Sequence, residues 1–158
     1  MKHRIFFIFL LLILQGGFQA KSQGLGWTSW EHLNDSLRKA KKPLLIFIHT
    51  DWCKYCRMQE NSTFTDAELI RVLNQDFYCL QLDAETTDEI IFLGKKYTFQ
   101  TSGAGTGHHS LAQTLGKEQG KLSFPTTVLL NKNLQIVCHL PGFVSKEVFK
   151  ETLNKFRG

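Results

Sequence analysis

Apolar residues follow two different spacings along the chain, and these predict helices and strands in turn. Apolar side chains three and four positions apart, preceded by Thr28 and Glu31 at capping-box spacing, predict a first helix over residues 29–41. The unbroken apolar run at residues 44–49 predicts a buried strand. The later elements are predicted as helices over 53–61, 66–74, 89–97, 110–115 and 146–156, and as strands over 77–83, 126–130 and 135–140.

Capping and turn residues mark the ends of these elements. Thr65 and Glu68 have capping-box spacing ahead of the helix at 66–74, and Ser145 caps the last helix. The glycine-rich stretch 101–107 predicts a flexible loop, and residues 131–133 predict a hairpin turn between the last two strands. Helices alternating with strands, followed by a closing hairpin and helix, predict an α/β fold in which helices flank a central mixed sheet.

The first twenty residues have the order of a cleaved secretory signal. A basic start at Lys2 and Arg4 precedes ten apolar residues and then small and polar ones. Ten apolar residues are half of what a bilayer span needs, although a retained membrane anchor is the alternative. We expect a signal peptide over residues 1–20, with a second candidate cleavage position near Ser22. Residues 21–158 then form one domain, which the 42% of hydrophobic residues supply with a core.

The charge balance excludes several classes of partner. Removal of Lys2 and Arg4 with the signal leaves 17 basic residues against 14 acidic ones. An excess of about three positive charges is too mild to predict binding to nucleic acid or stable association with a membrane after cleavage. Export matters more, because it places the four cysteines where disulfides form.

The stretch Thr-Asp-Trp-Cys-Lys-Tyr-Cys at residues 50–56 carries the candidate chemistry. Its two cysteines, Cys53 and Cys56, lie two residues apart directly after the predicted strand and at the start of a predicted helix. Such a pair is a redox couple, half of a metal site or a structural disulfide. A domain with this much apolar core does not need a disulfide that closes so short a loop, which makes the structural reading the weakest of the three.

Three separated landmarks in register resemble the thioredoxin superfamily. They are W-C-x-x-C at residues 52–56, Phe124-Pro125-Thr126 at the start of a strand, and Gly142 after the next strand. The resemblance covers residues 27–157 and is nearest to exported thioredoxin-like proteins, such as the C-terminal domain of the bacterial transmembrane thiol-disulfide interchange protein. It implies a thioredoxin fold with an insertion before the strand that follows Pro125, since 41 residues separate that proline from Asp83.

The resemblance implies a thiol-disulfide oxidoreductase that exchanges disulfides with other proteins and needs no cofactor. Only a thiolate attacks a disulfide, and the start of a helix together with Lys54 favours the anion at Cys53. Cys53 is therefore the expected nucleophile, and Cys56 is expected to resolve the mixed disulfide. Reduction, oxidation and isomerisation of substrates all stay open, as does the identity of the redox partner.

Pro125 and two aromatic residues are the expected substrate-binding residues. In the resembling family this proline follows a cis peptide bond beside the cysteine pair, although a trans proline that only marks a strand boundary is the alternative. The backbone of Phe124 is then free to pair with an extended segment of the substrate. Trp52, next to the cysteines, is expected to contact the same segment.

Two departures from the family concern the charge beneath the cysteines. The family has a buried acid where this chain has Phe47 and a facing lysine where it has Cys79, so that both members of an ion pair are missing together. His49, on the same strand face as Phe47, is a possible proton acceptor for Cys56, or a strand-end histidine without that role. Cys79 and Cys138 are expected to be separate buried thiols, with Cys79 as a third thiol below Cys56 as a further possibility.

A metal-delivery protein is the second hypothesis, because Cys53 and Cys56 with His49, His108 or His109 would make a soft site for copper or zinc. The loop ending in His108 and His109 is otherwise either a substrate contact or a tolerated surface insertion. A third hypothesis is a binding module whose cysteines are idle. We prefer the exported thioredoxin-like protein among these hypotheses. Because its C-terminal residues do not form a retention signal, we expect a periplasmic or secreted location.

Overall fold

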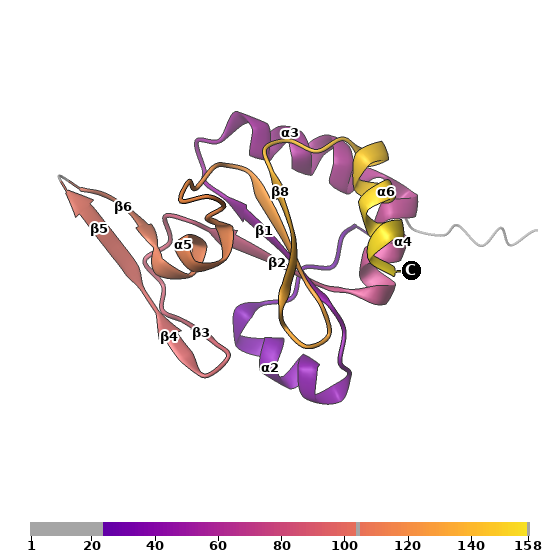
Figure 1. Cartoon of the computed structure of the whole chain (residues 1–158), viewed down its shortest axis with the longest axis horizontal. Helices are drawn as coiled ribbons and strands as arrows, with labels where there is room; N and C mark the ends of the chain where they lie inside the picture. The colour runs from indigo at the N-terminus through magenta and orange to yellow at the C-terminus, as the bar shows by residue number, and fades with distance from the viewer. Residues whose placement is uncertain (1–23, 104, 158) are drawn as a thin grey trace, which may run out of the picture.

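A four-stranded mixed sheet forms the centre of the molecule. The structure, a computed structural model, describes residues 24–103 and 105–157 (Figure 1). The strands lie in the order β2-β1-β7-β8, with β1 parallel to β2 and antiparallel to β7, and β8 antiparallel to β7. Their bounds are β1 Leu44–His49, β2 Tyr78–Asp83, β7 Thr126–Leu130 and β8 Ile136–Pro141. The predicted fold class is therefore confirmed.

Helices cover both faces of this sheet. They are α2 Trp30–Lys39, α3 Lys54–Ser62, α4 Ala67–Asp76, α5 Ser110–Gly116 and α6 Lys146–Arg157, with a 3₁₀ turn at Thr63–Thr65. Successive residues of a strand point to opposite faces, so Leu45 and Phe47 pack with α3, α4 and α6, while Ile46 and Ile48 pack with α2 and α5. Burial on both faces explains why β1 is apolar almost throughout.

Most of the predicted elements are confirmed to within a few residues. The strand predicted at 44–49 has those bounds, and the helix predicted from Cys53 begins with Cys53 as its N-cap. Two caps were wrong in detail, because Ser29 rather than Thr28 caps α2 and Asp66 rather than Thr65 caps α4. The Asp66 carboxylate accepts a hydrogen bond from the Leu69 amide. The signal predicted over residues 1–20 lies outside the described residues.

The helix predicted over residues 89–97 is wrong. This segment is a hairpin of β3 (Ile90–Phe92) and β4 (Lys95–Tyr97), turned at Leu93 and Gly94, which both have positive φ. The residues of β3 alternate between buried and exposed, which suits a strand with one face on the core. The run Ile-Ile-Phe is too short for its spacing to separate a helix from a strand, and the Leu93–Gly94 turn decides the outcome.

The loop predicted over residues 101–107 is also wrong, since it belongs to a second hairpin. Strands β5 (Phe99–Gly103) and β6 (Thr106–His109) pair antiparallel and extend away from the central sheet (Figure 1). Gly107 permits this pairing, because a Cβ there would lie only 2.2 Å from the carbonyl oxygen of Gln100. Most of the insertion before Pro125 is therefore ordered into two hairpins and α5.

Backbone hydrogen bonds join this insertion to the end of β1 above which the cysteines lie. The Ala84 amide donates to the His49 carbonyl at 2.8 Å, and the His109 amide donates to the Ala84 carbonyl at 2.6 Å. The last residue of β6 is thus attached to the last residue of β1 through one intervening residue. The insertion consequently has a fixed position beside the candidate site.

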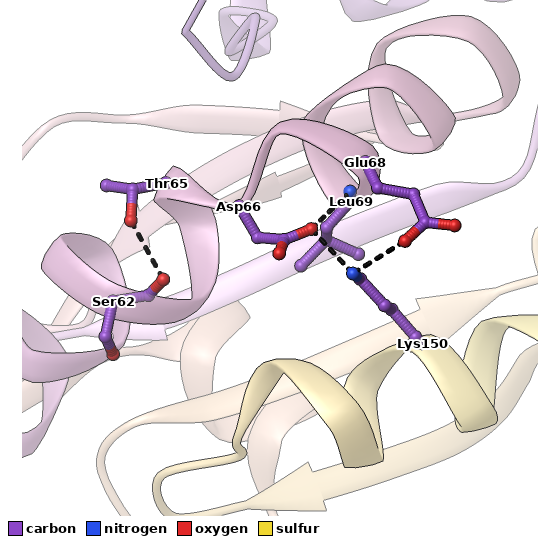
Figure 2. A network of polar contacts seen from close by, with 6 residues as sticks. All are labelled: Ser62, Thr65, Asp66, Glu68, Leu69 and Lys150. Atoms are coloured by element: carbon purple, nitrogen blue, oxygen red, sulfur yellow. Dashed lines mark hydrogen bonds and ion pairs between the residues drawn. The ribbon is translucent and has the colours of Figure 1, made fainter.

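The last helix is tied to α4 by a cluster of charges (Figure 2). Lys150 of α6 lies 2.9 Å from the Asp66 carboxylate and 2.7 Å from that of Glu68. The pKa of Asp66 lies below its usual value, because the Leu69 amide donates to its carboxylate and Lys150 lies beside it. Asp66 therefore both caps α4 and positions α6.

Replacing Asp66 with alanine should lower the free energy of unfolding by about 1 kcal/mol at pH 7. Because the pKa of Asp66 is lower in the folded state, its stabilisation is fully present above the unfolded pKa of about 3.9 and is lost as the pH falls through the folded pKa. Urea unfolding should therefore show a smaller difference in free energy of unfolding between wild type and Asp66→Ala at pH 3 than at pH 7. Asp66→Asn keeps a capping oxygen and should lose less, and equal losses at both pH values would contradict this role.

Candidate functional site

The two cysteines lie where β1 gives way to α3. The Cys53 amide donates to the Thr50 carbonyl at 3.2 Å, which turns the chain after the strand, and Cys53 then caps the helix. Its sulfur accepts a hydrogen bond from the Cys56 amide at 3.0 Å. Cys53 and Cys56 form a disulfide with their Cα atoms 5.2 Å apart.

Burial alone does not separate the two sulfurs, because Cys53 and Cys56 are 3% and 2% exposed. On the outer side of the pair, the neighbouring side chains of Trp52 and Tyr55 are 63% and 60% exposed. On the inner side both cysteines belong to the apolar cluster that contains Phe47 and Phe64. The disulfide thus closes the top of this cluster beneath a rim of exposed aromatic side chains.

Trp52 is held in place from two directions. Its indole Nε1–H donates to the Glu85 carboxylate at 3.0–3.1 Å, and its ring meets the Phe124 ring edge-on at a centroid distance of 6.0 Å. The His108 ring lies on Phe124 at 5.6 Å. The predicted Trp52 and Phe124 are therefore brought together, and the insertion contributes Glu85 and His108 to the same surface.

The peptide bond between Phe124 and Pro125 is cis, as the family resemblance implied. The Pro125 carbonyl accepts a hydrogen bond from the Gly142 amide at 2.7 Å, so the landmark glycine holds the proline segment. Phe124 is half-buried and packs against the cluster that includes both cysteines. Within the described part of the chain its own backbone makes no hydrogen bond, which leaves that backbone available to an extended segment.

His49 is the last residue of β1, the strand that leads to the cysteine pair. Its ring stacks on Phe47 at a centroid distance of 5.6 Å and borders a groove of about 540 Å³ that Trp30 and Asp83 also line. Among the described residues the ring makes no hydrogen bond. A role as proton acceptor stays a prediction.

His109 is a structural residue, because both nitrogens of its ring are engaged. Nδ1 accepts a hydrogen bond from the Leu111 amide at the start of α5, so Nε2 carries the proton and donates to the Asp88 carbonyl at 3.1 Å. Burial lowers the pKa of this histidine and favours the neutral form. Neither nitrogen is left for a metal ion, and the described residues contain no group of three histidine, cysteine or acidic side chains suited to one.

Cys79 and Cys138 are free thiols on the two edge strands, β2 and β8, as expected, but only Cys79 is buried, because Cys138 is half-buried. Burial raises the pKa of Cys79 to about 12, so this thiol does not ionise near neutral pH. Cys79 and Phe47 belong to the same cluster. The positions that a family ion pair would occupy are thus filled by apolar packing.

Sequence reasoning missed two residues of the site, Glu85 and Gln59. Glu85 is fixed by its contact with Trp52, which depends on how the insertion folds. Gln59 is buried in α3, and its side-chain oxygen accepts a hydrogen bond from the Val144 amide at 2.8 Å. The one signal for Gln59 was its position three residues after Cys56, on the same side of the helix.

Comparison with known proteins gives a family and a fold. Residues 31–157 match the family described as a thioredoxin-like domain. Spermatogenesis-associated protein 20 of Mus musculus is 28% identical over 80 residues, which are 50% of this chain and 10% of that protein. The matched part thus spans about a tenth of the length of this relative.

Two solved structures have the same fold at low identity. A thioredoxin from Thermus thermophilus has a TM-score of 0.60 and 17% identity, covering 85% of this chain and 88% of its own. The C-terminal domain of Neisseria meningitidis DsbD, in its oxidised form, has a TM-score of 0.51 and 18% identity, covering 82% and 97%. None of the helices in the described part of the chain reaches the length and hydrophobicity of a membrane span.

Proposed function

The chain belongs to the thioredoxin-like domain family, and on that basis we propose that it is an exported thiol-disulfide oxidoreductase acting on protein substrates through Cys53 and Cys56. The observation that carries this proposal is the disulfide between two cysteines at the start of α3, beside a cis-proline segment. A structural disulfide would need neither the exposed aromatic rim nor a free backbone next to it.

The chemistry follows from the position of Cys53 at the helix start. In the reduced protein, unpaired amides and the helix dipole favour its thiolate. That thiolate attacks one sulfur of a substrate disulfide, and the other sulfur leaves as a thiolate and takes up a proton. Cys56 then attacks Cys53, so the substrate leaves as a dithiol and the Cys53–Cys56 disulfide forms again. The same steps in reverse oxidise a substrate dithiol.

Trp52, Phe124 and Pro125 are the substrate-binding residues in this proposal. Trp52 offers an exposed ring, and the cis bond at Pro125 presents the unpaired backbone of Phe124. An extended substrate segment would pair with that backbone as an added strand and bring its disulfide to Cys53. His108 would border the segment from the side of the insertion.

The location and partners are further parts of the proposal. The basic and apolar order of residues 1–20 supports export to the periplasm or the exterior. There the protein would need a second redox partner to return its cysteine pair to the starting state after each turnover. No observation on the described residues favours the copper or zinc alternative.

Equilibration of the purified mature protein against glutathione buffers, with metal removed, tests this function. We expect a reversible two-electron couple at Cys53 and Cys56, read by alkylation and mass spectrometry. A reduction potential near about −270 mV would identify a reductase, and one near about −120 mV an oxidase. Absence of a reversible couple, with tight binding of copper or zinc by the reduced protein, would refute the oxidoreductase and favour metal delivery.

A further inference from the structure

Gln59 lies in α3 three residues after Cys56, and the donor group of its side-chain amide is unused. Gln59 is 0% exposed, and among the described residues its Nε2 has no hydrogen-bond partner. The assignment of the two amide atoms is fixed, because the Val144 amide can only donate and therefore faces Oε1. A buried donor without an acceptor costs free energy, so its presence needs an explanation.

The geometry of α3 places the Gln59 side chain on the same side of the helix as Cys56. Residues three apart on a helix are neighbours on its surface, and helical side chains lean toward the N-terminus, which from Gln59 is the direction of Cys56. The backbone of Val144 is held on both sides, since its amide donates to Gln59 and its carbonyl accepts a hydrogen bond from the Thr63 hydroxyl at 2.7 Å. The chain before Val144 is anchored near the cysteines through the hydrogen bond between Gly142 and Pro125.

Cys56 needs such a donor when it is reduced. Its sulfur lies in an apolar cluster with Phe47 and Phe64, where a thiolate is poorly solvated. Phe47 stands where a family member would have an acid, so the residue beneath the pair offers neither a proton acceptor nor a donor. In the oxidised protein the sulfur is bonded to Cys53 and carries no charge, which explains why the donor is idle in that state.

We propose that Gln59 is a positioning residue whose Nε2 donates a hydrogen bond to the Cys56 sulfur once the disulfide opens, and so holds it as the attacking thiolate. This rests on the proposed function. In the step it serves, the Cys56 thiolate forms a bond to the Cys53 sulfur while the bond between Cys53 and the substrate sulfur breaks. The electron pair of the broken bond leaves with the substrate sulfur, which takes a proton from water, and Gln59 keeps its own protons throughout.

The test separates the two steps with oxidised glutathione as the probe. Reduced wild type, Gln59→Met and Thr63→Val are mixed with oxidised glutathione, quenched in acid and analysed by mass spectrometry over time. Hydrogen bonds to charged groups are strong enough that Gln59→Met should slow resolution of the glutathione adduct by about tenfold or more, with its pH midpoint raised. Formation of the adduct by Cys53 should be unchanged.

Thr63→Val is the matched control, because it removes the other side-chain hydrogen bond to the Val144 peptide and leaves the Gln59 amide in place. It should resolve the adduct at the wild-type rate. Equal slowing in both variants would assign the effect to the loosened segment at Val144 and overturn the proposal, as would wild-type resolution in Gln59→Met. If wild type itself forms no adduct, the proposed function fails instead.

A measurement on wild type covers the case in which Gln59→Met does not fold. In nuclear magnetic resonance spectra of the reduced protein, the side-chain amide signals of Gln59 should shift with the same pH midpoint as the Cys56 Cβ. In the oxidised protein they should not titrate over that range. If the chemical shifts of the Gln59 side-chain amide in the reduced protein do not change as Cys56 ionises, the proposal is overturned.

Discussion

Replacing Cys53 with serine should reduce the rate of disulfide exchange by about 10³-fold or more, to the level of the uncatalysed reaction. A serine hydroxyl does not ionise near neutral pH, and the remaining thiol of the pair, Cys56, lacks the N-cap position that favours a thiolate at Cys53. Cys79 is buried with a pKa of about 12, and Cys138 lies on the opposite edge strand, β8, where burial also raises its pKa. Exchange is measured with a disulfide-bonded protein substrate and a thiol reductant.

Replacing Cys56 with serine should give a different defect. Cys53 would still attack, but nothing would release the substrate, so a covalent adduct should accumulate and turnover should stop after one event. Non-reducing electrophoresis and mass spectrometry distinguish this adduct from the inert Cys53→Ser protein. Cys138→Ser is the control and should keep wild-type turnover.

The asymmetry between the two cysteines comes from the helix rather than from burial. Both sulfurs are almost fully buried, but only Cys53 is the N-cap and receives the amide hydrogen bond from Cys56. Cys53 also borders the exposed Trp52, over which a substrate can approach. If Cys53→Ser formed the stable adduct and Cys56→Ser did not, these assignments would be reversed.

The sequence predicted those parts of the fold that depend on local signals. The strand at Leu44–His49 is apolar throughout because both of its faces are buried, and the start of α3 was marked by the cysteine pair itself. The cis bond at Pro125 followed from the family resemblance, since nothing within the sequence alone distinguishes a cis from a trans proline. Local signals and a family landmark thus sufficed for the central sheet and the redox pair.

The insertion was predicted poorly because its structure depends on distant contacts. The sequence predicts a helix over residues 89–97, but Phe92 packs edge-on against Trp30 from the first helix, a contact that the strand β3 provides. The glycines in residues 101–107 predict a loop, but Gly103 and Gly105 adopt positive φ within a hairpin and Gly107 permits close approach of the neighbouring strand. His109 was a candidate ligand until the structure placed both ring nitrogens in hydrogen bonds.

Replacing Phe47 with aspartate, the acid of the resembling family, should destabilise the protein by more than about 4 kcal/mol. Phe47 is fully buried between Trp27, His49 and Phe64, and truncating a buried phenylalanine alone costs about 3–5 kcal/mol. The new carboxylate would also be buried without a partner. A total stability of about 5–15 kcal/mol is typical of such domains, so much of the protein would unfold in mild urea.

The pH dependence and a second substitution identify the cause. Burial would raise the pKa of the new carboxyl in the folded state, so the folded protein is favoured below the unfolded pKa of about 3.9 and loses this advantage as the pH rises through the folded pKa. The free energy of unfolding that Phe47→Asp loses relative to Phe47→Leu should therefore be smaller at low pH.

Cys79 lies beside Leu45 on the neighbouring strand, within diagonal reach of position 47 for a long side chain. Cys79→Lys should accordingly recover part of the stability lost in Phe47→Asp while destabilising the wild type, because each charge is tolerated only with the other. If the losses in free energy of unfolding of the two single variants simply add in the double variant, the core around position 47 has no room for an ion pair, and this prediction is wrong.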